Sequence, residues 1–140
     1  MAAAPLNRSH NDDPRKLRDL IQKAFNLARA YELKSVVVGM SGVEGDLVFP
    51  EIVDYVGSAL RVDDGIFRMT RERAVFFLAD ADRERAQEIM ERLLYGFQER
   101  FSSVEEQRVS LAYFEVTPGI PALTVRDVLP SLFGTGLVTH

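Results

Sequence analysis

The chain has 140 residues, of which 46% are hydrophobic and 27% charged, with no cysteine and a formal net charge of −4. These values are typical of one globular domain with its own core, and they exclude disulfide bonds. The acidic balance gives no electrostatic footprint for DNA or RNA, so no nucleic-acid partner is expected. The opening MAAAPLNRSHNDDP is not patterned as a signal peptide, and no apolar run could span a bilayer. We therefore expect a cytoplasmic protein without a membrane partner.

The beginning of the chain differs in composition from the rest. Residues 1–12 are polar and alanine-rich and are expected to form a flexible tail, followed by one domain over residues 13–140. Asp12 or Asp13 before Pro14 predicts a helix start, because aspartate caps helices and proline tolerates the first helical position. The sequence contains no internal repeat and no low-complexity linker.

Three elements are predicted before the middle of the chain. Apolar residues at helical spacing continue the first helix to about Tyr31, and the β-branched run over 34–40 predicts a buried strand. SGVEGD is a turn, and a second helix is predicted over 46–60, with Pro50 near its start. The side chains expected on the buried face of this second helix are Ile52, Val53, Val56, Ala59 and Leu60.

Two short apolar runs, GIFRM over 65–69 and AVFFLA over 74–79, predict a β-hairpin joined by TRER. Hairpin turns usually carry Asn, Asp or Gly, because the favoured two-residue turns need positive φ. The charged residues at this tip are therefore unusual for a hairpin and require an explanation.

A long helix is predicted over 82–101, then a strand over 108–116 and a short helix over 123–133 broken at Pro130. Residues 134–140 are expected to form a tail or a small terminal strand. The aromatic residues assigned to the core are Phe76, Phe77, Phe97, Phe101, Tyr113 and Phe114.

The predicted order of elements is α-β-α-β-β-α-β-α. A hairpin placed between helices that cross one sheet indicates an α+β sandwich, with a mixed, mainly antiparallel sheet covered by helices and related to the ferredoxin-like core. This pattern predicts a fold and carries no function.

The spacing of charged residues around the hairpin is more informative. Arg61 and Asp64 form an R-x-x-D motif, Arg68 follows four residues later, and TRERA then occupies 70–74. This register resembles the bacterial diguanylate cyclase, or GGDEF, domain, in which an R-x-x-D inhibitory site precedes the Gly-Gly-Asp/Glu-Glu-Phe signature. Arg92, in MERLL, matches a further arginine that reaches the inhibitory site in that family. The resemblance covers roughly residues 13–133, and it implies a degenerate GGDEF-like domain.

The departures from the family pattern concern the catalytic positions. Gly39 or Ser41 stands where the family has a metal-binding aspartate at the end of the first strand, and the segment before Gly45 is too short to hold the family's guanine-binding piece. Thr70 and Arg71 replace the two glycines, which places side chains where a triphosphate would meet bare backbone. The remaining signature residues are Glu72, Arg73 and Ala74, and the single carboxylate of Glu72 is a poor site for a divalent cation. We expect no catalytic residue, no metal and no enzymatic activity.

The inhibitory-site residues Arg61, Asp64 and Arg92 are retained, and the resemblance implies that they bind cyclic di-GMP as a regulatory ligand. An arginine fork can donate to guanine O6 and N7 or to a phosphate, and a carboxylate can accept from the guanine N1 and N2 hydrogens. Arg68 is a possible accessory contact. The predicted function is a non-catalytic cyclic di-GMP receptor that modulates a protein partner, with a homodimer as one further possibility.

Other interpretations of the same residues stay open. An isolated R-x-x-D is usually an ion pair on the surface, and Arg68 is more often a solvated strand residue than a ligand contact. TRER is either a solvated turn whose charges discourage edge pairing or a tip that docks a protein. The alternative function is a ligand-independent scaffold that binds its partner through the TRERA hairpin or the first helix.

Overall fold

The computed structural model describes residues 11–101 and 109–134, and within them the predicted order of helices and strands is confirmed. In chain order the elements are α2 (Pro14–Tyr31), β1 (Ser35–Ser41), α3 (Phe49–Ser58), β2 (Gly65–Thr70), β3 (Arg73–Ala79), α4 (Arg83–Arg100), β4 (Ser110–Val116) and α5 (Val125–Phe133). The tail or strand expected over 135–140 lies outside the described residues.

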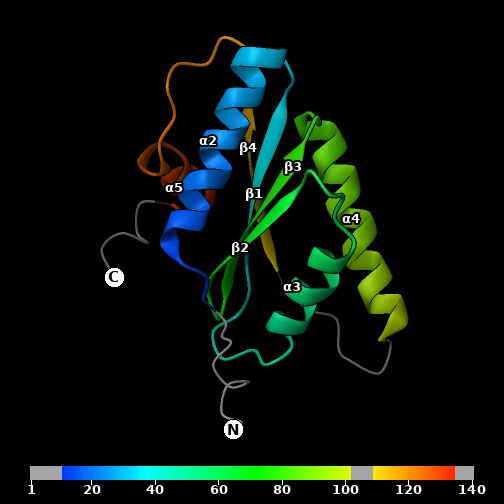
Figure 1. The fold of residues 1–140 in the computed structure, drawn as a ribbon. Helices are drawn as coiled ribbons and strands as arrows, with labels where there is room; N and C mark the ends of the chain where they lie inside the picture. Colours follow the sequence, from blue (N-terminus) through cyan, green and yellow to red (C-terminus); the bar gives the residue numbers. More distant parts are fainter. Residues whose placement is uncertain (1–10, 102–108, 135–140) are drawn as a thin grey trace, which may run out of the picture.

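The four strands form one sheet in the order β2-β3-β1-β4. The sheet was expected to be mixed and mainly antiparallel, and all three of its strand pairings are antiparallel. From β1 to β4 the chain follows the β-α-β-β-α-β order of the ferredoxin-like motif. Figure 1 shows α2 and α5 covering one face of the sheet, and α3 and α4 covering the other. The predicted α+β sandwich is therefore confirmed.

Each face of the sheet has its own apolar layer. Val36, Val38 and Met40 of β1 join the cluster that contains α3 and α4, whereas Val37 joins the cluster that contains α2 and α5. Because helices cover the central strands β1 and β3 on both faces, the side chains that point to either face are buried and must be apolar. This explains why their sequences read as continuous apolar runs rather than as alternating ones.

The first helix begins at the predicted place. Of the two candidate caps, Asp13 is the N-cap, and its carboxylate accepts a hydrogen bond from the Arg15 backbone N–H at 2.9 Å. Asp12, expected in the flexible tail, is instead bonded to the edge of β2: its N–H donates to the Arg68 carbonyl at 2.8 Å, and its carboxylate accepts from the Arg68 N–H at 2.7 Å. Asp12 thus covers part of an otherwise unpaired strand edge.

Three details of the predicted elements are wrong. The second helix ends at Ser58, so Ala59 is exposed and does not join its buried face. Phe101 lies at the end of α4 and is 38% exposed, packing on Phe97 at the margin of the core. Pro130 does not break the last helix, which runs through it to Phe133 because the Thr124–Asp127 capping box and the buried Val128 and Leu132 hold it.

The close contact between β1 and α5 depends on Gly39. A Cβ atom built at this position would lie 2.8 Å from the Leu132 Cβ and 3.1 Å from the Phe133 ring. The Leu132 Cβ is fixed to the helix backbone, so α5 itself would have to move to make room for a methyl group.

Gly39→Ala should therefore lower the free energy of unfolding by about 1–2 kcal/mol, because overpacking outweighs the entropic gain from removing a glycine. Gly57→Ala is the matched control, since its Cβ would meet only the flexible Cδ1 of Ile66 at 3.1 Å and would improve the helix α3. Urea denaturation of both variants checks this expectation. Equal stabilities for Gly39→Ala and the wild type would show that α5 adapts freely.

Candidate functional site

The R-x-x-D motif lies in the loop between α3 and β2, and Asp64 joins this loop to the end of β3. One carboxylate oxygen of Asp64 accepts the Ala79 backbone N–H at 2.9 Å, and the other accepts the Arg61 backbone N–H at 2.9 Å. The Asp64 side chain is only 4% exposed. Its carboxylate is therefore a structural acceptor, and the interpretation of R-x-x-D as a simple surface ion pair does not describe it.

The guanidinium of Arg61 is held by the same carboxylate. Its Nε and Nη2 atoms lie 3.4 Å from the two Asp64 oxygens, and Nη2 also donates to the Ala79 carbonyl. The Arg61 side chain is 58% exposed, so its guanidinium is oriented by the buried Asp64 and remains accessible from solvent. Asp64 receives four hydrogen bonds in all, so it holds Arg61 in position rather than offering a free acceptor.

Arg61, Asp64 and Arg92 line one cleft, although Arg92 lies in a different element, the middle of α4. The cleft has a volume of about 280 Å³. Within the described residues, Arg92 makes no hydrogen bond or ion pair, so its guanidinium is free to bind a ligand. The structure thus brings together the three residues on which the predicted site depends.

Two further charged residues line the same cleft and were not predicted from the sequence. These are Asp80, which adopts a left-handed backbone conformation with φ of 56°, and Arg85 of α4. Arg85, Ile89 and Arg92 are spaced at i, i+4 and i+7, so they follow one face of the helix. That spacing was present in the sequence and could have identified Arg85.

The possible accessory residue Arg68 lies elsewhere. Its guanidinium pairs with Asp54 of α3 at 2.8 Å, and its backbone is bonded to Asp12. It does not line the cleft of Arg61 and Arg92. The structure therefore assigns Arg68 to the packing of β2 against α3.

The charged hairpin tip is tied to the loop that follows β1. The Gly42 N–H donates to the Glu72 carbonyl at 2.8 Å, and the Gly45 N–H lies 3.4 Å from a Glu72 carboxylate oxygen. Thr70 stabilises the turn, since its hydroxyl oxygen accepts the Glu72 N–H at 3.2 Å. Arg71 is exposed at the tip. The turn predicted within SGVEGD is present at Glu44 and Gly45, with Gly45 at a φ of 82°, whereas Ser41 still belongs to β1.

The other signature positions serve packing. Arg73 places its guanidinium carbon 5.8 Å from the centre of the Phe133 ring, and Ala74 is buried in the core. In residues 11–101 and 109–134, no three His, Cys, Asp or Glu side chains are grouped to hold a metal ion. No helix of these residues is both long and apolar enough to cross a membrane.

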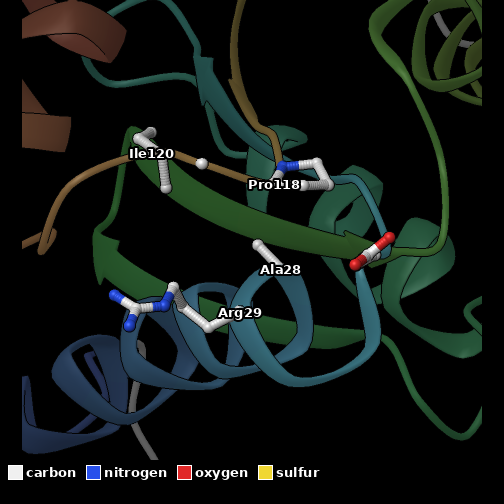
Figure 2. A pocket seen from close by; sticks show the side chains of 6 residues that line it. Ala28, Arg29, Pro118 and Ile120 are labelled. Atoms are coloured by element: carbon white, nitrogen blue, oxygen red, sulfur yellow. The ribbon is translucent and has the colours of Figure 1, made fainter.

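A second hollow, of about 310 Å³, lies between the end of α2 and the loop after β4 (Figure 2). It is lined by Ala28, Arg29, Glu32, Pro118, Gly119 and Ile120. The guanidinium of Arg29 lies over the Phe25 ring, 5.4 Å from its centre. This hollow has one arginine, already in contact with a ring, and is less suited to an anion than the cleft of Arg61 and Arg92.

No protein-family model and no curated protein matches this sequence. Solved structures do match. The chain superimposes on the GGDEF domain of FimX from Pseudomonas aeruginosa with a TM-score of 0.68 at 13% identity, over 89% of each chain. It superimposes on the GGDEF domain of DgcB from Caulobacter crescentus, solved in complex with c-di-GMP, with a TM-score of 0.59 at 14% identity, over 79% of this chain and 77% of that one.

A third match is the diguanylate cyclase SiaD from Pseudomonas aeruginosa, solved in complex with its activator SiaC. The TM-score is 0.64 at 17% identity, over 79% of this chain and 49% of SiaD, so the chain spans about half of that protein. At these identities the likeness establishes the fold: the chain has the fold of GGDEF domains, as the R-x-x-D register and the hairpin indicated.

Asp64→Ala should lower the free energy of unfolding by about 1–3 kcal/mol, because it leaves the Ala79 and Arg61 N–H groups without an acceptor. Asp63→Ala removes the neighbouring charge, and its carboxylate makes no hydrogen bond or ion pair within the described part of the chain. The control should stay within about 0.5 kcal/mol of the wild type. Denaturant titration measures the free energy of unfolding of both variants. Equal decreases in the two would contradict the role given to Asp64.

Proposed function

We propose that this domain binds cyclic di-GMP at the cleft of Arg61, Asp64 and Arg92 and thereby changes its affinity for a protein partner in the cytoplasm. The observation that carries the proposal is that Arg61 and Arg92, from separate elements, face one cleft with their guanidinium groups accessible or unpaired. Guanidinium forks suit both chemical features of the ligand, because they bind phosphates and the O6/N7 edge of guanine. The GGDEF fold shared with a domain solved in complex with c-di-GMP supports the same ligand class.

The three residues have different parts in the proposed site. Arg92 offers an unpaired guanidinium, and Arg61 offers one that Asp64 has already oriented. Such orientation lowers the side-chain entropy lost on binding. Asp64 contributes as a positioning residue, since a guanine base would have to displace Arg61 to reach its carboxylate.

The proposal includes no catalysis. Thr70 and Arg71 fill the glycine positions of the signature, and the Glu72 carboxylate faces the Gly45 N–H rather than an open site. Gly39, which with Ser41 is one of the two candidates for the family's metal position, permits the close contact of β1 with α5. A ligand effect on the partner then requires only that cyclic di-GMP prefers one of two conformations of the domain.

Isothermal titration with cyclic di-GMP should show micromolar or tighter binding by the wild type. Arg61→Ala should weaken that binding by about tenfold or more, since one charge-assisted contact is worth about 1.5–3 kcal/mol. Arg71→Ala removes an equal charge from the exposed hairpin tip and should bind like the wild type. If cyclic di-GMP gives no heat and no shift of melting temperature with the wild type, the proposal is overturned. An equal loss of affinity in Arg61→Ala and Arg71→Ala would also overturn it. Light scattering in the same samples would show whether a ligand dimer bridges two copies of the domain.

Incubation of the wild type with GTP and either Mg²⁺ or Mn²⁺ should yield no cyclic dinucleotide, because the signature positions lack the glycines and the second carboxylate. Chromatography of the nucleotides after prolonged incubation is the readout, with an active diguanylate cyclase as the positive control. Product formed by this chain, and lost when Glu72 is changed to Gln, would show that the domain is a cyclase.

The scaffold function is supported by a separate observation. Val43 and Leu47 are 54% and 73% exposed, in a loop that is bonded to Glu72 of the hairpin tip. A groove of about 500 Å³ also lies along α2, where the apolar Ile21, Leu123 and Val125 alternate with polar residues that include Arg18 and Arg126. If the scaffold function is correct, cyclic di-GMP leaves the affinity for the partner unchanged, and Leu47→Asp or a charge placed in the groove abolishes it.

A further inference from the structure

We propose that Arg85 is the second phosphate-binding residue of the cleft, and that it leaves Glu88 to bind the ligand. This inference rests on the proposed function. Cyclic di-GMP carries two phosphodiester groups, each with one negative charge, so a site that binds both needs two available cations. Of the three arginines in the cleft, Arg92 alone makes no ion pair or hydrogen bond within the described residues.

The second cation must therefore come from Arg61 or Arg85, and the structure distinguishes them. Arg61 is held by two contacts with the buried Asp64 carboxylate and by the Ala79 carbonyl. Arg85 is held only by Glu88, through one contact of 3.2 Å between side chains that are each more than half exposed. An exposed pair of this kind contributes little to stability, so Arg85 is released at lower cost than Arg61.

The position of Arg85 also fits the extent of the ligand. Arg85 lies two helical turns from Arg92 on the same face of α4, which places the two residues roughly 10 Å apart along the helix. The cleft continues past Arg85 into a neighbouring hollow of about 380 Å³ that includes Lys34 and shares Asp80 and Ala81 with it. A dinucleotide can thus lie along α4, with one phosphate near each arginine and Arg61 left for a base.

Titration calorimetry of four variants tests the inference. Arg85→Ala should weaken cyclic di-GMP binding about tenfold, and Glu88→Gln should tighten it about twofold, because the competing carboxylate is removed. The controls are Arg83→Ala and Glu84→Gln, which remove the same charges from nearby positions at the start of α4. The Arg83 guanidinium donates a hydrogen bond of 2.8 Å to the Tyr113 carbonyl, and Arg83 does not line the cleft. Both controls should bind within about twofold of the wild type, since exposed charges outside the site are largely screened.

Phosphorus NMR of the bound ligand separates a phosphate contact from a general effect on charge or stability. The two phosphates are equivalent by symmetry in free cyclic di-GMP and become distinct when each faces a different arginine. Arg85→Ala should move one bound signal and Arg92→Ala the other.

Wild-type binding that Arg85→Ala leaves unchanged, or bound signals that Arg85→Ala does not move, would overturn the inference and leave the proposed function intact. Looser binding by Glu88→Gln would also overturn it. Absence of any wild-type binding would instead remove the proposed function and the inference together.

Discussion

The buried carboxylate of Asp64 is the contact on which the candidate site depends. It accepts the backbone N–H of Arg61, in the loop before β2, and that of Ala79, at the end of β3. It therefore fixes where β2 begins relative to where β3 ends. A carboxylate that accepts several N–H donors is costly to remove, because each donor loses a charge-assisted acceptor. The same carboxylate orients Arg61, so one side chain sets both the loop geometry and the direction of the Arg61 guanidinium.

The site is divided between this loop and the helix α4. The loop holds Arg61 nearly in place, whereas Arg85 and Arg92 project from one face of α4 with weak partners or none. The loop is also joined to α2, because the Lys23 ammonium donates to the Asp63 carbonyl at 2.9 Å. A ligand that displaces the loop must therefore move α2 with it or break this bond. Under the proposed function, the ligand changes the affinity for the partner only by as much as it distinguishes two positions of this loop.

Much of the fold could be predicted from local sequence. β1 and β3 were predicted from their continuous apolar runs, which the structure explains by their cover on both faces, and α2 from an aspartate before Pro14 and helical spacing. The features that local sequence did not predict depend on tertiary packing. Pro130 stays inside α5 because Val128 and Leu132 are buried on either side of it, and Asp12 is held by a strand edge that local pattern does not reveal.

The same distinction applies to the site. The R-x-x-D register predicted which residues would meet, and Arg61, Asp64 and Arg92 do line one cleft. Sequence could not indicate that one Asp64 oxygen is occupied by the Ala79 N–H, because that donor lies at the far end of β3. It also could not place Arg68 in its pair with Asp54, away from the cleft, since that depends on how β2 crosses α3.

The most direct test of the account is to map the cyclic di-GMP site by amide NMR. Titration of the labelled domain should shift the backbone amides of Arg61, Asp64 and Ala79 and of α4 around Arg92, while those of the hairpin tip at Arg71 and Glu72 stay in place. Shifts centred on the hairpin tip, or no shifts at all at millimolar ligand, would contradict the claim that this cleft is the nucleotide-binding site.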